Sequence, residues 1–155
     1  MSRRYLAGFV QAGLFNPLVA PTPTYLYNLL SWGKNNFGQL GLGNITNYSS
    51  PKQVGSLTTW LNITAGSYHT LATKTDGTLW TWGNNNYGQL GLGNTDNQTV
   101  LTQMNTTVIG GRTPQSIYCN SEATYALMDD GTIWSTGRNS VGELGIAVGD
   151  RTQRN

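Results

Sequence analysis

Short runs of apolar and β-branched residues alternate with turn residues along most of the chain. In the segment 63–83, ITAGSYHTLATKTDGTLWTWG, one run lies at 69–73 and another at 78–82, with Asp76-Gly77 between them. The segment 123–137 repeats this arrangement, with TYALM and TIWST on either side of Asp130-Gly131. An Asp-Gly pair between two β-prone runs is a strong hairpin signal. The pattern predicts two antiparallel hairpins, and no segment after residue 30 has a convincing helical pattern.

The glycine-rich stretches beside these runs are copies of one phrase. GKNNFGQLGLGN at 33–44 recurs as GNNNYGQLGLGN at 83–94, each time directly after a tryptophan, Trp32 or Trp82. A more divergent copy, TGRNSVGELGIAVGD, occupies 136–150, and the four extra residues before it fall in the stretch 105–114. A period near 50 residues that varies only in loops is typical of repeat architectures, in which each unit stacks on its neighbours.

The repeated phrase lacks the spacing of a phosphate-binding loop. A P-loop requires G-x-x-x-x-G-K followed by Ser or Thr, and a dinucleotide loop requires G-x-G-x-x-G between a strand and a helix. Neither copy leads into a helical pattern. We therefore interpret the glycines as positions of tight turns and close packing between sheets, with leucines filling the space between them. The structural repeat positions are Trp32, Gly38, Leu40, Gly41, Trp82, Gly88, Leu90, Gly91, Gly142, Leu144 and Gly145.

The phrase W-G-x-N-x-[FY]-G-Q-L-G-L-G, preceded by S-Y-H-T-L-A and D-G-T-L-W, resembles the regulator of chromosome condensation repeat. The resemblance covers residues 26–155. It implies an all-β fold of β-propeller blades, which form a seven-bladed ring in known members. Kelch and WD-type repeats have related periods, but their paired-glycine and Trp-Asp signatures are missing here. The third copy departs from the pattern at Thr136, Val141 and Glu143, which predicts a less regular blade.

Residues 1–25 belong to no repeat and form a separate region. Two arginines precede an apolar stretch interrupted by glycine and alanine, and three prolines follow it. The stretch is too short for a membrane span, so we expect an extended anchoring arm and a stiff segment that leads to the repeats. The arm loosely resembles those of structural proteins in tailed bacteriophages. Its expected anchor residues are Tyr5, Leu6, Phe9, Leu14 and Phe15.

The repeats at 26–155 amount to two full periods and part of a third. Closed propellers use about four to eight blades, so the chain supplies only a partial ring. Two solutions are open at this point. Either further repeats lie in a longer chain, or three copies share one ring as a homotrimer.

Composition narrows the classes of partner. Charged residues make up 10% of the chain, against about 25% in average globular proteins. The net charge is +2, and the basic residues form no run longer than two. A nucleic-acid-binding surface normally has a clustered basic footprint. We therefore expect protein partners, with no nucleic-acid binding.

The residue types used in catalysis are few and occupy repeat or turn positions. Cys119, the only cysteine, aligns with Ala65, and His69, the only histidine, aligns with a small residue of the next repeat. Both positions favour packing roles. Asp76 and Asp130 lie at hairpin turns, where Asp is preferred for its local hydrogen bonds. We predict no catalytic, metal or cofactor-binding site and expect the protein not to be an enzyme.

Two hypotheses for function remain. In the first, the chain is a virion structural protein whose arm anchors it to a capsid or tail shell while the repeats form an outward binding surface. Its location would then be the virion. In the alternative, it is a cytoplasmic or nuclear interaction propeller, or a guanine nucleotide exchange factor for a small GTPase, as the resemblance implies.

Overall fold

The computed structural model describes residues 4–8, 27–56, 59–105 and 109–146, and these form strands and turns without a helix. The all-β prediction is therefore confirmed for the described part of the chain. The strands are β1 (Arg4–Gly8), β2 (Tyr27–Gly33), β3 (Tyr48–Gln53), β4 (Trp60–Ala65), β5 (His69–Lys74), β6 (Leu79–Gly83), β7 (Gln98–Gln103), β8 (Pro114–Cys119), β9 (Ala123–Met128) and β10 (Ile133–Gly137).

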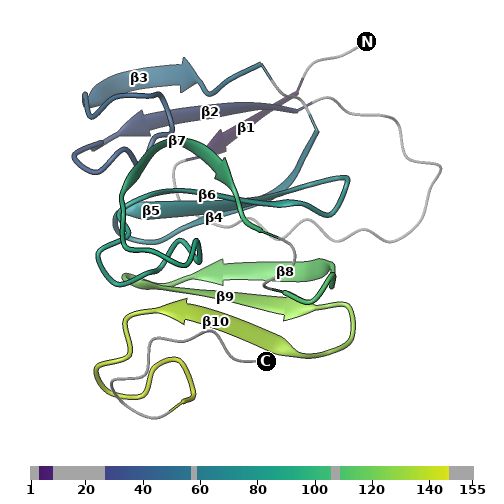
Figure 1. The fold of residues 1–155 in the computed structure, drawn as a ribbon. Helices are drawn as coiled ribbons and strands as arrows, with labels where there is room; N and C mark the ends of the chain where they lie inside the picture. The colour runs from purple at the N-terminus through teal and green to yellow at the C-terminus, as the bar shows by residue number, and fades with distance from the viewer. Residues whose placement is uncertain (1–3, 9–26, 57–58, 106–108, 147–155) are drawn as a thin grey trace, which may run out of the picture.

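The strands form three sheets stacked one on another (Figure 1). The first sheet has the order β1-β2-β3, the second β4-β5-β6-β7 and the third β10-β9-β8. Both predicted hairpins are present, because β5 pairs antiparallel with β6 and β9 with β10. Asp76 and Asp130 close the two turns by accepting hydrogen bonds from the amides of Thr78 (3.0 Å) and Thr132 (2.9 Å).

The first sheet departs from the repeat pattern at its edge. Strand β5 pairs antiparallel with β6, whereas β1 pairs parallel with β2, from Arg4↔Tyr27 to Gly8↔Ser31. Residues 4–8 were expected in an arm outside the repeats. In the structure, the backbone of Tyr5 and Leu6 instead belongs to strand β1 of the first sheet. The other expected anchor residues, Phe9, Leu14 and Phe15, lie outside the described residues.

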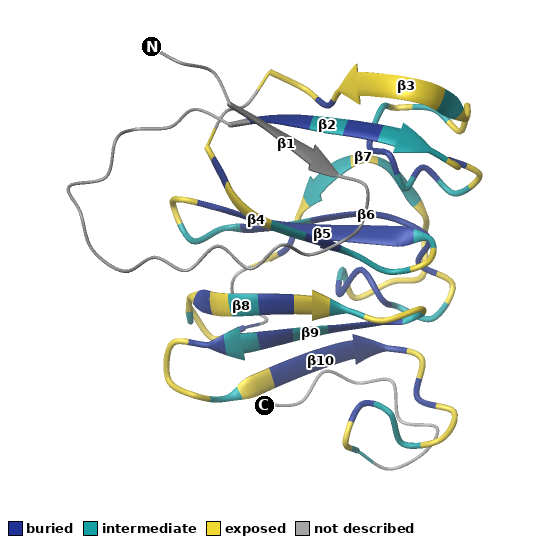
Figure 2. Ribbon diagram, turned by 180° about the vertical axis from the view of Figure 1, so that it is seen from behind, coloured by how far each residue is buried: buried dark blue, intermediate teal, exposed yellow. Residues whose placement is uncertain are grey.

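The core lies between the sheets, and the middle sheet is covered on both faces by its two neighbours. Between the first and second sheets a cluster contains Leu29, Val54, Trp60, Ala72 and Trp82. Between the second and third sheets a larger cluster contains Leu71, Leu79, Met104, Ile109, Ile117, Ala126, Met128 and Trp134. Successive side chains of a strand point to opposite faces. Because β5 lies inside the middle sheet, both of its faces are covered, and all six of its residues are buried (Figure 2).

Candidate functional site: the loop face

The loops that contain the repeated phrase gather at one end of the three sheets, on the left in Figure 1. They follow β2, β6 and β10 and span 34–47, 84–97 and 138–146. The short turns at 66–68 and 120–122 lie at the same end. We call this end the loop face. The two Asp-Gly hairpins lie at the opposite end, so the loop face is formed by the repeated phrase and these short turns.

In each long loop, one buried asparagine forms hydrogen bonds to the loop backbone. The Oδ1 of Asn85 accepts a hydrogen bond from the Leu90 amide at 2.9 Å, and its Nδ2 donates to the Asn94 carbonyl at 3.0 Å. Asn35 makes the same two contacts in the first loop, and the Oδ1 of Asn139 accepts from the corresponding amide of the third at 3.3 Å. Asn35 and Asn85 are 0% exposed. These asparagines were missing from the repeat positions singled out above, although their recurrence was visible in the sequence.

The glycines of the phrase permit a close approach between one loop and the next sheet. A β-carbon on Gly41 would stand 3.0 Å from Nε1 of Trp82, and one on Gly91 would stand 2.5 Å from the Trp134 ring. Both glycines also have positive φ, which side chains disfavour. The leucines of the phrase, Leu40, Leu90 and Leu144, are buried, as is Trp82, whereas Trp32 is half-buried. The other repeat glycines, all with positive φ, are Gly38, Gly88, Gly142 and Gly145.

A carbonyl of each of the first two loops accepts hydrogen bonds from the next sheet. The Gln39 carbonyl accepts from Thr70 Oγ1 at 3.0 Å and from Trp82 Nε1 at 2.9 Å. The Gln89 carbonyl accepts from Thr124 Oγ1 at 2.8 Å. These contacts join segments that are 31 to 43 residues apart in sequence. They fix the position of each loop relative to the following sheet.

The third loop keeps one of the internal hydrogen bonds of the second loop and replaces another with an ion pair. In the second loop Gln89 accepts from the Tyr87 amide at 2.9 Å and donates to Asn84 at 2.8 Å. In the third loop Glu143 accepts from the amide two residues earlier at 2.7 Å, and Arg138 replaces the asparagine, with its Nε 3.9 Å from the carboxylate. Backbone amide hydrogen bonds lower the pKa of Glu143 to about 2, so the carboxylate is charged at neutral pH.

Cations and aromatic rings alternate along the surface of the loop face. Lys34 Nζ lies 5.1 Å from the centroid of the Tyr68 ring, and Phe37 packs edge-on against the same ring at 5.1 Å. The Arg138 guanidinium lies 5.6 Å from the Tyr87 ring. Each of these contacts joins one sheet or its loop to the neighbouring one. Aromatic and arginine side chains are the types enriched at protein–protein interfaces.

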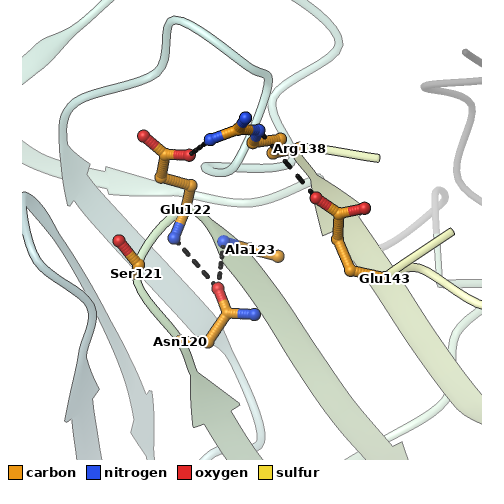
Figure 3. A pocket seen from close by; sticks show the side chains of 6 residues that line it. All are labelled: Asn120, Ser121, Glu122, Ala123, Arg138 and Glu143. Carbon is orange, nitrogen blue, oxygen red and sulfur yellow. Dashed lines mark hydrogen bonds and ion pairs between the residues drawn. The ribbon is translucent and has the colours of Figure 1, made fainter. Parts of the chain in front are cut away.

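A pocket of about 310 Å³ opens on the loop face of the third sheet (Figure 3). Arg138 lies between two carboxylates there, with its Nη1 2.6 Å from Glu122 Oε2. Asn120 Oδ1 accepts from the amides of Glu122 (2.9 Å) and Ala123 (2.7 Å) and fixes the turn. Ser121 and Glu143 complete the lining. The pocket presents charged hydrogen-bonding groups to a binding partner, without a nucleophile hydrogen-bonded to a base.

The remaining candidates for chemistry lie away from this surface or cannot ionise readily. Burial raises the pKa of the Cys119 thiol to about 12 and lowers the pKa of His69 to about 4, so both are neutral at pH 7. Within the part of the chain that the structure describes, no three His, Cys, Asp or Glu residues are grouped to hold a metal ion. The same residues include no helix long and apolar enough to cross a membrane.

Comparison with known proteins identifies the repeats. The profile of the regulator of chromosome condensation (RCC1) repeat matches residues 28–73 and 76–126, and a second RCC1 repeat profile matches 60–89 and 115–143. The chain is 34% identical over 126 residues to the secretion-regulating guanine nucleotide exchange factor of Bos taurus. That alignment covers 79% of this chain and 27% of the relative.

Solved structures agree on the fold. Human WBSCR16 superposes with a TM-score of 0.68 at 24% identity, over 82% of this chain and 32% of that one. Yeast RCC1 (Prp20), solved in complex with Kap60, superposes with a TM-score of 0.65 at 20% identity, over 81% and 32%. The sheets are thus blades of an RCC1-type propeller, and the chain spans about a third of the length of these proteins.

These findings correct the functional hypothesis drawn from the sequence. The prediction of a virion structural protein located in the virion is wrong, since the relatives come from cattle, humans and yeast and one is an exchange factor. The comparisons give no support to the bacteriophage resemblance of the arm, to a virion-shell partner or to a homotrimer. The chain belongs to the regulator of chromosome condensation (RCC1) repeat family.

Proposed function

We propose that this chain is the blade segment of a cellular protein-interaction propeller that acts in guanine nucleotide exchange on a small GTPase. The observation that carries the proposal is the 34% identity to an exchange factor over 79% of the chain. The loop face is the proposed docking surface. Its expected contact residues are Lys34, Tyr68, Tyr87 and Arg138.

The geometry of the loop face suits a binding role. Its loops are held by buried asparagines and by hydrogen bonds to the next sheet, so little conformational entropy is lost when a partner docks. Lys34 and Arg138 lie over aromatic rings, which restricts their motion while leaving their charges exposed. A rigid surface of this kind provides affinity without any group that takes part in a covalent step.

Nucleotide exchange requires binding energy and no nucleophile. A protein that binds the nucleotide-free GTPase more tightly than the nucleotide-bound form weakens nucleotide binding by the same factor, because coupling between two ligands is reciprocal. The described residues of the loop face supply hydrogen-bonding, charged and aromatic groups for such a contact. The proposal therefore agrees with the absence of a catalytic arrangement among them.

A second candidate function is protein binding without exchange. The chain corresponds to only 27% of the length of the exchange factor that it matches. Exchange activity belongs to that whole protein, and the segment that corresponds to this chain can contribute binding surface alone. The two candidates differ in whether the partner is bound preferentially in its nucleotide-free form.

The test is binding of the purified chain to a panel of small GTPases in nucleotide-free, GDP-loaded and GTP-loaded forms, with release of a fluorescent GDP analogue followed in parallel. We expect preferential binding of a nucleotide-free GTPase and faster release of the analogue. Arg138→Glu should weaken binding at least tenfold, whereas Lys52→Glu, on the exposed strand β3 outside the loop face, should not.

Three outcomes separate the alternatives. Binding that Arg138→Glu weakens but that ignores nucleotide state supports the interaction module without exchange. Binding that responds equally to the Arg138 and Lys52 substitutions contradicts the loop face as the docking surface. Absence of binding across the panel contradicts both functions for this segment.

A further inference from the structure

His69 is buried at the contact between the second and third sheets. It begins strand β5 and is 1% exposed. Its Nε2 lies 3.0 Å from the Oγ1 of Thr124, at the start of β9 in the next sheet. The same hydroxyl lies 2.8 Å from the Gln89 carbonyl of the preceding glycine-rich loop. One threonine hydroxyl thus connects the histidine ring, the second loop and the third sheet.

The hydrogen bonds of Thr124 determine the tautomer of the neutral ring. A hydroxyl has one proton to donate, and Thr124 donates it to the Gln89 carbonyl. The hydroxyl must therefore accept from His69, which places the proton of the neutral imidazole on Nε2. Nδ1 then carries a lone pair, and this buried nitrogen has no hydrogen-bond partner in the structure. Protonation of the ring would add a second N–H at that position.

The surroundings of Nδ1 leave little space for a compensating group. A β-carbon at Gly66 would overlap the His69 ring and the Asn120 carbonyl oxygen, so backbone closely covers this edge. Strand β6 contributes no titratable side chain. On β8 and β9 the titratable side chains are Tyr118, Tyr125 and Cys119, and the Cys119 thiol lies 3.8 Å from the Thr124 hydroxyl.

The charged residues nearest to this contact are paired with one another, distant or exposed. In the turn before β9, Glu122 forms an ion pair with Arg138. On β5 itself the charged residue is Lys74, at the far end of the strand. In the second loop the titratable residues are Tyr87 and Asp96, and Asp96 is exposed. A positive charge on His69 would therefore be buried beside neutral groups.

We propose that protonation of His69 opens the contact between the second and third sheets, so that this blade interface is an acid-sensitive switch. Burial lowers the pKa of His69 to about 4, and the polar backbone of Ala123 partly opposes the shift. The ordinary pKa of histidine is 6.5. The interface is stable above the ordinary value, and its stability falls as the pH drops from 6.5 toward 4.

The expected size of the response follows from proton linkage. Between these two pKa values the open state binds one more proton than the closed state, so each pH unit changes the ratio of closed to open forms about tenfold. Over the whole interval the ratio falls about 300-fold. Below pH 4 the contribution of His69 is exhausted, because both states are then protonated.

The test uses the fact that His69 is the only histidine of the chain. The Hε1 signal of the folded wild-type protein, followed by NMR against pH, should titrate well below 6.5. Denaturant titrations between pH 4.5 and 7.5 should show a pH dependence that His69→Gln abolishes, since glutamine donates a hydrogen bond without titrating. Thr124→Ser keeps the hydroxyl and should keep the pH dependence.

Hydrogen exchange locates the effect. At pH 5 the amides of β8 and β9 should exchange at least threefold faster in the wild type than in His69→Gln at the same pH. Equal exchange, or an unchanged pH slope in the variant, would overturn the switch. If His69→Gln does not fold, the wild-type titration still decides, because a histidine that titrates near 6.5 in the folded protein contradicts the proposal.

Discussion

Gly41 lies directly against the indole of Trp82, one repeat farther along the chain. A β-carbon at this glycine would stand 3.0 Å from the ring nitrogen, which donates to the Gln39 carbonyl in the same loop at 2.9 Å. The glycine in the repeated phrase is therefore required for close contact with the following sheet as well as for the turn of its own loop. Gly91 has the corresponding relationship with Trp134.

The first prediction compares two glycines that have similar positive φ values but different surroundings. Gly91 and Gly93 have φ values of 65° and 75°, but a β-carbon on Gly93 would have no neighbour within 4 Å. Gly91→Ala and Gly93→Ala should share the cost of a side chain at positive φ. Gly91→Ala should lose a further ~1–3 kcal/mol of unfolding free energy through overpacking, as measured by urea titration. Equal losses would contradict close packing as the reason for Gly91.

The second prediction concerns Asn85, whose side chain forms hydrogen bonds across the second loop. Asn85→Ala removes hydrogen bonds to the Leu90 amide and the Asn94 carbonyl, and both Asn85 and Leu90 are buried. Leaving a buried amide without a partner costs about 1–3 kcal/mol. We expect a loss in this range by chemical denaturation. Asn86→Ala, at the exposed neighbouring position, should stay within about 0.5 kcal/mol of the wild type.

The third prediction concerns the acid end of the pH–stability profile. Hydrogen bonds from the Thr132 side chain and amide, followed by the contact with Arg112, lower the pKa of Asp130 from 3.8 to about 2. A lowered carboxyl pKa stabilises the fold at pH values above 3.8, and this stabilisation is lost as the pH falls toward 2. Asp130→Asn should therefore flatten the thermal-stability profile between pH 4 and 2. Asp129→Asn, at the adjacent exposed position, provides the control.

The fourth prediction concerns Lys74, which occupies the repeat position of the buried Met128. Its side chain is buried, with Nζ 3.5 Å from the centroid of the Trp80 ring. Burial lowers the pKa of this amine, so stability should rise with pH up to the ordinary lysine value. A charge taken out of water carries a desolvation cost that an apolar side chain of similar volume does not. We expect Lys74→Met to stabilise the protein by about 1 kcal/mol and to abolish this rise.

The control for Lys74 is Lys52→Met, because Lys52 lies over the Tyr48 ring in the exposed strand β3. This change should leave the unfolding free energy nearly unchanged. A marked destabilisation by Lys74→Met alone would show that the attraction between the ammonium and the indole faces exceeds the cost of burying the charge. Thermal unfolding at pH 7 and pH 10 measures both effects.

Local sequence signals determined the hairpins and the repeat. Asp76-Gly77 specifies a turn through hydrogen bonds between residues two apart, and such contacts do not depend on the rest of the fold. The recurrence of the phrase at 33–44 and 83–94 indicated stacked units and the RCC1 family. Hydrogen bonds within the loops, such as Asn85 to Leu90, follow the same local logic and were predictable from the recurrence of both residues.

Only the tertiary structure decided which residues meet between units. Gln39 and Trp82 are in contact although they are 43 positions apart in sequence. The pocket brings together Glu122, directly before β9, and Arg138, directly after β10. The parallel pairing of β1 with β2 has no counterpart in the other sheets and no local signal. Periodicity reports which residues face a neighbour, whereas pairing between distant segments depends on how whole sheets stack. For that reason the sequence determined the blades, and the structure decided how they combine into a loop face.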